Sequence, residues 1–160
     1  MLADLVIDTN VFVHADNPAE KRYTAASALL NALVDGETEI GVDDGFDLDP
    51  SANKSLIGHE YLEKLTPLSA GFRVLAHLAQ SGRTKFVSKK FDPATRKQIN
   101  QIVRNKRDRT FLLVSTEMDD RVFCSHDFKD FQKRKRRDIK AKLGVSILEA
   151  DEVLNAMSES

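Results

Sequence analysis

The sequence predicts an α/β protein, a three-layer α/β/α sandwich with a central, mostly parallel sheet. Short apolar runs of strand length alternate with segments of helical period along the chain, and this alternation is typical of a parallel sheet covered by helices on both faces. The length of 160 residues is enough for one sizeable core. No repeat, low-complexity tract or linker divides the chain, so residues 1–160 are expected to form a single domain.

The first part of the chain predicts two strands and two helices. Apolar runs predict the strands, and Pro, Gly and Ser mark where the helices begin and end. The expected elements are a strand at 5–7, a helix opening at Pro18-Ala19-Glu20 and closed by Gly36, a strand at 39–43, a loop at 44–54 and a helix capped by Ser55.

The second part predicts three more strands and five more helices by the same signals. They are a helix through Phe72–Ala79 closed by Gly82, a strand at 85–88, a helix from Asp92-Pro93, a helix that Asp108 caps or opens, a strand at 121–125, a loop at 127–131, a basic helix, a strand at 145–148 and a helix at 149–157.

Charge is strongly segregated although the net charge is only −1. Residues 1–60 hold 12 acids and 3 bases, residues 73–110 hold 11 bases and 2 acids, and residues 129–142 hold 8 bases and 2 acids. An acidic part of the chain can bind cations, and a basic part can bind phosphates. Basic runs also occur on solvated, exposed helix faces. The run at 133–137 has, in addition, the composition of a nuclear localisation signal. The bases expected to bind nucleic acid are Arg104, Lys106, Arg107, Lys133, Arg134 and Arg136.

The remaining composition indicates a cytoplasmic protein. The single Cys124 has no cysteine to pair with and lies in an apolar run, so we expect a buried, reduced thiol. No apolar run reaches the roughly 18 residues of a spanning helix, and the N-terminus lacks the pattern of a signal peptide. We therefore expect no membrane association.

Four acids occupy the positions that matter most for function. Asp8 directly follows the first strand, where open parallel sheets bind ligands. Glu60 and Asp108 lie at the beginnings of two apolar helices, and Asp127 follows a later strand. Carboxylates prefer hard cations such as Mg²⁺ or Mn²⁺, and sites that cut phosphodiesters crowd several acids around such ions. The structural alternatives are a turn cap for Asp8, a surface position for Glu60 and an N-cap for Asp108.

The motifs around these acids resemble those of PIN-domain nucleases. They are Ile7-Asp8-Thr9-Asn10-Val11-Phe12, His59-Glu60-Tyr61, Asp108 ahead of Phe111-Leu112, and Val122-Phe123-Cys124-Ser125-His126-Asp127, and the resemblance extends from residue 5 to about 154.

The resemblance implies a PIN-like, Rossmann-like domain and a Mg²⁺- or Mn²⁺-dependent endonuclease. Such an enzyme cleaves phosphodiester bonds by metal-activated water, with single-stranded RNA as the favoured substrate. Asp8, Glu60, Asp108 and Asp127 would be both the catalytic residues and the metal ligands. Asn10 and Ser125 would give the site polar support.

Three segments depart from the usual pattern of this family. Residues 43–56 are longer and more acidic, residues 83–107 form a basic insertion, and one extra residue near Phe128 leaves Asp127 and Asp130 as rivals for the fourth acid. Asp43 and Asp44 are expected to be solvated loop acids.

Several functional alternatives stay open at this point. A catalytically silent PIN-like module that binds nucleic acid or protein would keep the fold, and a DNA-directed nuclease would keep the chemistry. The resemblance also raises the role of toxin in a toxin–antitoxin pair, with an antitoxin chain and a second copy of this chain as candidate partners. A phosphohydrolase of the haloacid type is disfavoured because Asn10 stands where a second aspartate is needed.

Overall fold

The computed structural model describes residues 1–159 and contains one five-stranded sheet in which every pairing is parallel. The strand order is β3-β2-β1-β4-β5. The strands are β1 (Asp4–Ile7), β2 (Glu39–Asp43), β3 (Thr84–Val87), β4 (Val122–Cys124) and β5 (Ser146–Leu148).

Eight helices in the described residues connect and follow these strands. They are α1 (Thr9–His14), α2 (Tyr23–Asp35), α3 (Leu56–Lys64), α4 (Ala70–Gln80), α5 (Pro93–Ile102), α6 (Lys106–Thr116), α7 (Lys133–Leu143) and α8 (Ala150–Ser158).

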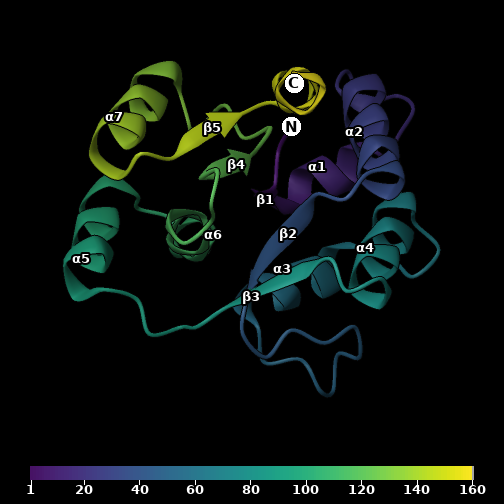
Figure 1. The fold of residues 1–160 in the computed structure, drawn as a ribbon, viewed down its shortest axis with the longest axis horizontal. Helices are drawn as coiled ribbons and strands as arrows, with labels where there is room; N and C mark the ends of the chain where they lie inside the picture. Colours follow the sequence, from purple (N-terminus) through teal and green to yellow (C-terminus); the bar gives the residue numbers. More distant parts are fainter. Residues whose placement is uncertain (160) are drawn as a thin grey trace.

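The chain builds the sheet in two directions from its centre, and this divides seven of the eight described helices between the two faces, while α3 contacts both α1 and α6. From β1 it adds β2 and then β3 on one side, and it returns to add β4 and β5 on the other. Helices α1, α2, α4 and α8 pack on one face, whereas α5, α6 and α7 lie on the other (Figure 1). Helix α6 contacts β1, β2 and β4. The predicted three-layer α/β/α sandwich is therefore confirmed.

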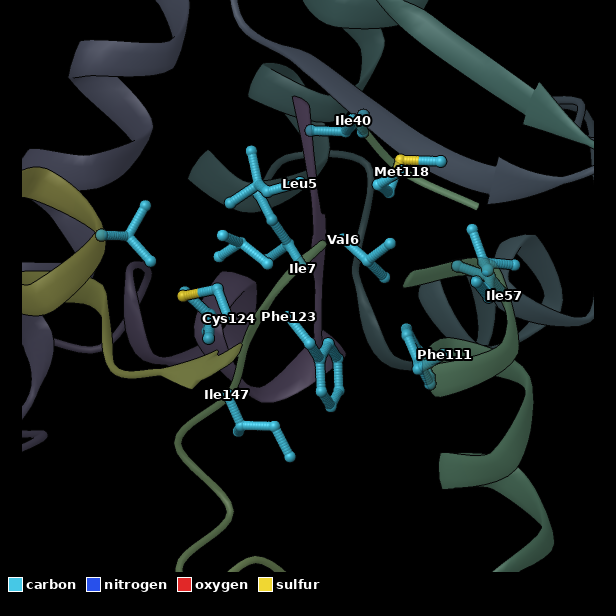
Figure 2. Packing of buried hydrophobic residues seen from close by; sticks show 14 of the residues in the cluster. Leu5, Val6, Ile7, Ile40, Ile57, Phe111, Met118, Phe123, Cys124 and Ile147 are labelled. Atoms are coloured by element: carbon cyan, nitrogen blue, oxygen red, sulfur yellow. The ribbon is translucent and has the colours of Figure 1, made fainter. Parts of the chain in front are cut away.

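The core lies on both faces of β1. The register pairs Val6 with Phe123 and Ile7 with Cys124, and all four side chains are fully buried. Since neighbouring side chains on a strand point to opposite faces, Val6 and Phe123 face α6, where Phe111 stacks on Phe123 with ring centroids 5.6 Å apart. Figure 2 shows the two sets of side chains on either side of β1. The expectation that Cys124 is buried is confirmed.

Two predicted boundaries were wrong. The helix expected from Pro18 begins at Tyr23, because residues 17–20 form a turn in which Glu20 N–H donates to Asn17 O over 2.9 Å. The helix near Asp108 is capped by Asn105, whose side chain accepts from Arg107 N–H, so Asp108 lies in its first turn. Helix α1 was not predicted. None of the helices in residues 1–159 has the length and apolar content to cross a membrane.

Candidate metal centre

The candidate site lies where the direction of strand addition reverses, between β1 and β4. Asp8 directly follows β1, and Ser125 directly follows β4. In open α/β sheets this position opens a crevice at the carboxyl ends of the strands, since the connections of the two neighbouring strands leave to opposite faces. The topology therefore places the Asp8 carboxylate where such folds bind ligands.

The end of β1 around Asp8 is held in place by hydrogen bonds from the loop after β4 and from α3. Ser125 Oγ donates to Asp8 Oδ2 over 2.7 Å and accepts from Asp127 N–H over 3.0 Å. The buried Tyr61 hydroxyl donates to the carbonyl of Ile7, the residue before Asp8. Asn10 Oδ1 accepts from the backbone N–H after Ser125 over 3.2 Å. Ser125 and Asn10 thus join the loop after β4 to the end of β1.

All four acids singled out in the sequence line one cavity of about 280 Å³. They come from the end of β1, from α3, from the first turn of α6 and from the loop after β4. Asp8 and Asp108 are buried, whereas Glu60 and Asp127 are half-buried. The acids are Asp8, Glu60, Asp108 and Asp127, and the cavity is also lined by Thr9, Asn10, Val13, Lys64, Asn105, Arg107 and Phe111.

Asp127 and Asp130, the two rivals for the fourth position, both lie beside Asp108. Carboxylate oxygens of the three residues lie within 4.8 Å of one another. Asp127 lines the cavity that contains Asp8, whereas Asp130 lines a neighbouring hollow on the α7 side. Asp127 Oδ1 accepts from the backbone N–H groups of Lys129 and Asp130 over 3.1 and 2.8 Å, so its other oxygen carries no loop contact.

Crowding and burial change the acidity of the two buried acids. Burial first, and then the charges of Asp127 and Glu60, raise the pKa of Asp8 to about 6, although the hydrogen bond from Ser125 opposes the shift. Burial, followed by the charges of Asp8 and Asp127, raises the pKa of Asp108 to about 8. Negative charge is therefore unfavourable in this cavity unless a positive charge accompanies it.

The donor set of the cavity fits a divalent cation. Asp108 Oδ2 and Thr9 Oγ1 are buried and have no hydrogen-bond partner among the described residues, although buried polar atoms are normally paired. The carboxylates are hard oxygen donors, which Mg²⁺ and Mn²⁺ prefer over nitrogen or sulfur. A bound cation would satisfy the unpartnered Asp108 oxygen and offset the burial and the repulsion that together raise the two pKa values.

The predicted nucleic-acid-binding bases lie in four different settings. Lys106 and Arg107 are exposed and line the openings beside the acids, and Arg104 is exposed just before α6. Lys133 and Arg134 are exposed at the beginning of α7.

Arg136 differs from the other predicted bases because its contacts are structural. Its Nε donates to Phe131 O over 2.6 Å, and its guanidinium lies 4.8 Å from the Phe128 ring centroid. It is half-buried. Of the predicted bases, Lys106 and Arg107 are therefore the ones placed beside the acids.

The expectation of a solvated Asp43 was wrong. Asp43 is fully buried at the end of β2. Its carboxylate accepts from Ser55 Oγ over 2.6 Å and from the backbone N–H groups of Leu56 and Ile57 over 2.7 and 3.0 Å. It therefore caps the beginning of α3, the helix that carries Glu60. No sequence signal separates such an acid from a loop acid, because its partners follow after a long loop.

A histidine pair behind the site was also missed. His14 Nδ1 and His126 Nδ1 lie 2.9 Å apart, and His126 Nε2 accepts from Ala150 N–H over 3.2 Å. Burial lowers the pKa of His14, and burial together with the charge of His14 lowers that of His126 to about 4. The pair is therefore neutral near pH 7 and joins α1, α8 and the loop after β4.

Comparison with known proteins adds no relative. No protein-family model matches the chain, and no curated protein matches it.

Proposed function

We propose that this protein is a Mg²⁺- or Mn²⁺-dependent endonuclease that cleaves phosphodiester bonds in single-stranded RNA. The observation that carries the proposal is the convergence of four acids from four separate elements on one cavity. A fold gains nothing in stability from crowding buried carboxylates, since each one disfavours ionisation of the others. Such an arrangement is typical of a site that binds cations and uses them in catalysis.

The residues of the cavity would have different roles in binding the cation and in catalysis. Asp8, Glu60, Asp108 and Asp127 would hold the cation, with Ser125 fixing the orientation of the Asp8 carboxylate. A divalent cation supplies two things when bound: it lowers the pKa of water, and it stabilises negative charge on the phosphate oxygens. Attack by water rather than by the ribose 2′-hydroxyl would leave a 5′-phosphate and a 3′-hydroxyl.

Positive side chains at the rim complement this acidic floor. Lys64 and Arg107 line the same cavity, and Lys106 lines the adjoining one. Contacts of this kind to the phosphates on either side of the cut position a strand without reading its sequence. They also predict that binding weakens as salt is raised, because counterions are released from the nucleic acid.

Cleavage assays test the proposal directly. Labelled single-stranded RNA and DNA are incubated with Mn²⁺ or EDTA and with the wild-type protein, Asp8→Asn, or Asp35→Asn, a control at an exposed aspartate at the end of α2. We expect RNA cleavage that requires Mn²⁺, is lost in Asp8→Asn and persists in Asp35→Asn. Cleavage that survives both EDTA and Asp8→Asn would overturn the proposal.

Two further results of the same assay redirect the assignment. Preferred cleavage of DNA would keep the chemistry and change the substrate. Saturable RNA binding without turnover at saturating Mn²⁺ would assign a binding module instead. The role of toxin, with an antitoxin partner, stays a prediction from the resemblance alone, as does pairing with a second copy.

A further inference from the structure

A second cavity adjoins the acidic one and has a different chemical character. Its volume is about 350 Å³, and it shares Glu60, Arg107 and Phe111 with the acidic cavity. Because three residues line both, a molecule whose phosphate lies over the acids has its next chemical group at this second cavity.

The floor of the second cavity is apolar. Ile57 and Phe111 line it and are almost completely buried, with 1% and 2% of their surface exposed. Leu56, at the first position of α3, lines it too but is 59% exposed. A large apolar side chain exposed beside a pocket offers contact area that water does not satisfy. The floor and this wall favour a group with an apolar face.

The walls carry charges of both signs, which favours a neutral group over a phosphate as the occupant. Glu60 and Glu63 lie on one side of the cavity, and Lys106 and Arg107 line it as well. Two carboxylates repel an anion, whereas a neutral group with hydrogen-bonding edges can use both signs of charge. Arg107 lies where the two cavities meet, which is the place for the phosphate that links the two occupants.

We propose that this second cavity holds one unpaired nucleobase, that of the nucleotide next to the phosphodiester over the acids. The assignment rests on the proposed nuclease function. A nucleobase has an apolar face for Leu56 and a polar edge for Glu63 or Thr110, which also lines the cavity. A paired base can enter only after leaving its duplex, which costs free energy. The cavity therefore selects single strands.

A comparison of two exposed leucines tests this assignment. Leu56→Ser removes the apolar wall, and Leu68→Ser is the matched control, because Leu68 is 88% exposed and lines neither cavity. Both changes are made in Asp8→Asn so that binding is measured without cleavage. Fluorescence anisotropy is recorded for short labelled single strands, each with an abasic nucleotide at one position.

One abasic position is expected to weaken binding about tenfold in Asp8→Asn, because the apolar contact between the base and Leu56 is lost there. The same loss should appear in the Leu68→Ser background and disappear in the Leu56→Ser background, where the wall is already absent. The nucleobase pocket would be overturned by equal affinity for all abasic strands. It would also be overturned if the abasic nucleotide weakened binding to the same extent in the Leu56→Ser background.

Cleavage by the wild-type protein separates this result from the proposed function. If cleavage occurs and all abasic strands bind with equal affinity, the nuclease proposal is supported and the pocket assignment is wrong. If no strand is cut but one abasic position weakens binding only when Leu56 is present, the pocket assignment is supported and the nuclease proposal is wrong. Where both hold, the sensitive nucleotide should lie next to the cut.

Discussion

Replacement of Asp108 by asparagine should stabilise the metal-free protein, which is the opposite of what loss of a buried polar partner usually does. Asp108 is buried, one of its oxygens has no partner, and its pKa is raised from 3.8 to about 8. A carboxyl whose folded pKa lies above its unfolded pKa costs stability as the pH rises through the interval between them. At pH 7 the folded state therefore bears most of this cost, and Asp108→Asn removes it.

The size of the effect follows from the pKa shift. One pKa unit corresponds to about 1.4 kcal/mol, so the interval from 3.8 to pH 7 sets an upper limit of about 4 kcal/mol. Asparagine keeps the volume but alters the contact with Asp130, and we expect a net gain of about 1–3 kcal/mol at pH 7. For a chain of this length that is a rise of about 2–12 °C in Tm.

Thermal unfolding in EDTA between pH 4 and 8 measures the effect. The gain in Asp108→Asn should be small at pH 4, which is close to the unfolded pKa of 3.8, and should grow towards pH 8. Glu37→Gln, at an exposed acid between α2 and β2, is the control. Added Mn²⁺ should raise the Tm of the wild-type protein more than that of Asp108→Asn. A variant less stable than wild type at pH 8 would refute the inference that burial and neighbouring acids make Asp108 costly to the folded state.

Three further changes test other parts of the account. Asp4→Asn should destabilise the protein by about 1–3 kcal/mol at pH 7 in urea unfolding. Burial raises the pKa of Asp4, but two backbone N–H groups and Lys85 together lower it, so the stability that Asp4 contributes is present above pH ~4 and is lost as the pH falls. A difference between variant and wild type that is unchanged at pH 2.5 would contradict this. Ser55→Ala removes the side chain that accepts from Gly58 N–H at the start of α3 and leaves the Asp43 carboxylate in place. It should cost about 1–2 kcal/mol and weaken Mn²⁺ binding. Full Mn²⁺ affinity would show that the Ser55 cap does not position the helix. Gly71→Val should cost about 1–3 kcal/mol, because a Cβ there lies 2.9 Å from Phe12 Cβ and O; a neutral result in thermal unfolding would mean that α4 moves freely from α1.

The central strands β1 and β4 were predictable because each contains an apolar run that is buried on both faces, as a parallel sheet requires. Helix α1 was not predictable, since Thr9, Val11 and Val13 are β-branched residues that lower helix propensity. It forms because Val11 and Phe12 pack in the core. Tertiary contacts, rather than local preference, decide that segment.

The candidate site could be predicted to a similar degree. The positions of Asp8 and Asp127 follow from their places after strands, because parallel strands end at the same edge of the sheet. The relation between Asp127 and Asp130 depends on the path of one loop, in which the Asp127 carboxylate accepts two backbone N–H groups. The buried role of Asp43 depends on α3 returning to the end of β2. Contacts of this kind have no local pattern in the sequence.

A titration with Mn²⁺ followed by electron paramagnetic resonance tests whether the four acids form one divalent-metal site. It needs no knowledge of the substrate. The free Mn²⁺ signal should fall saturably with wild-type protein. Asp8→Asn and Asp108→Asn should each weaken binding by about tenfold or more, since removing one ligand of a metal site has at least the effect of removing a supporting contact. Mn²⁺ binding that is absent from the wild-type protein, or unchanged in both variants, would contradict the account.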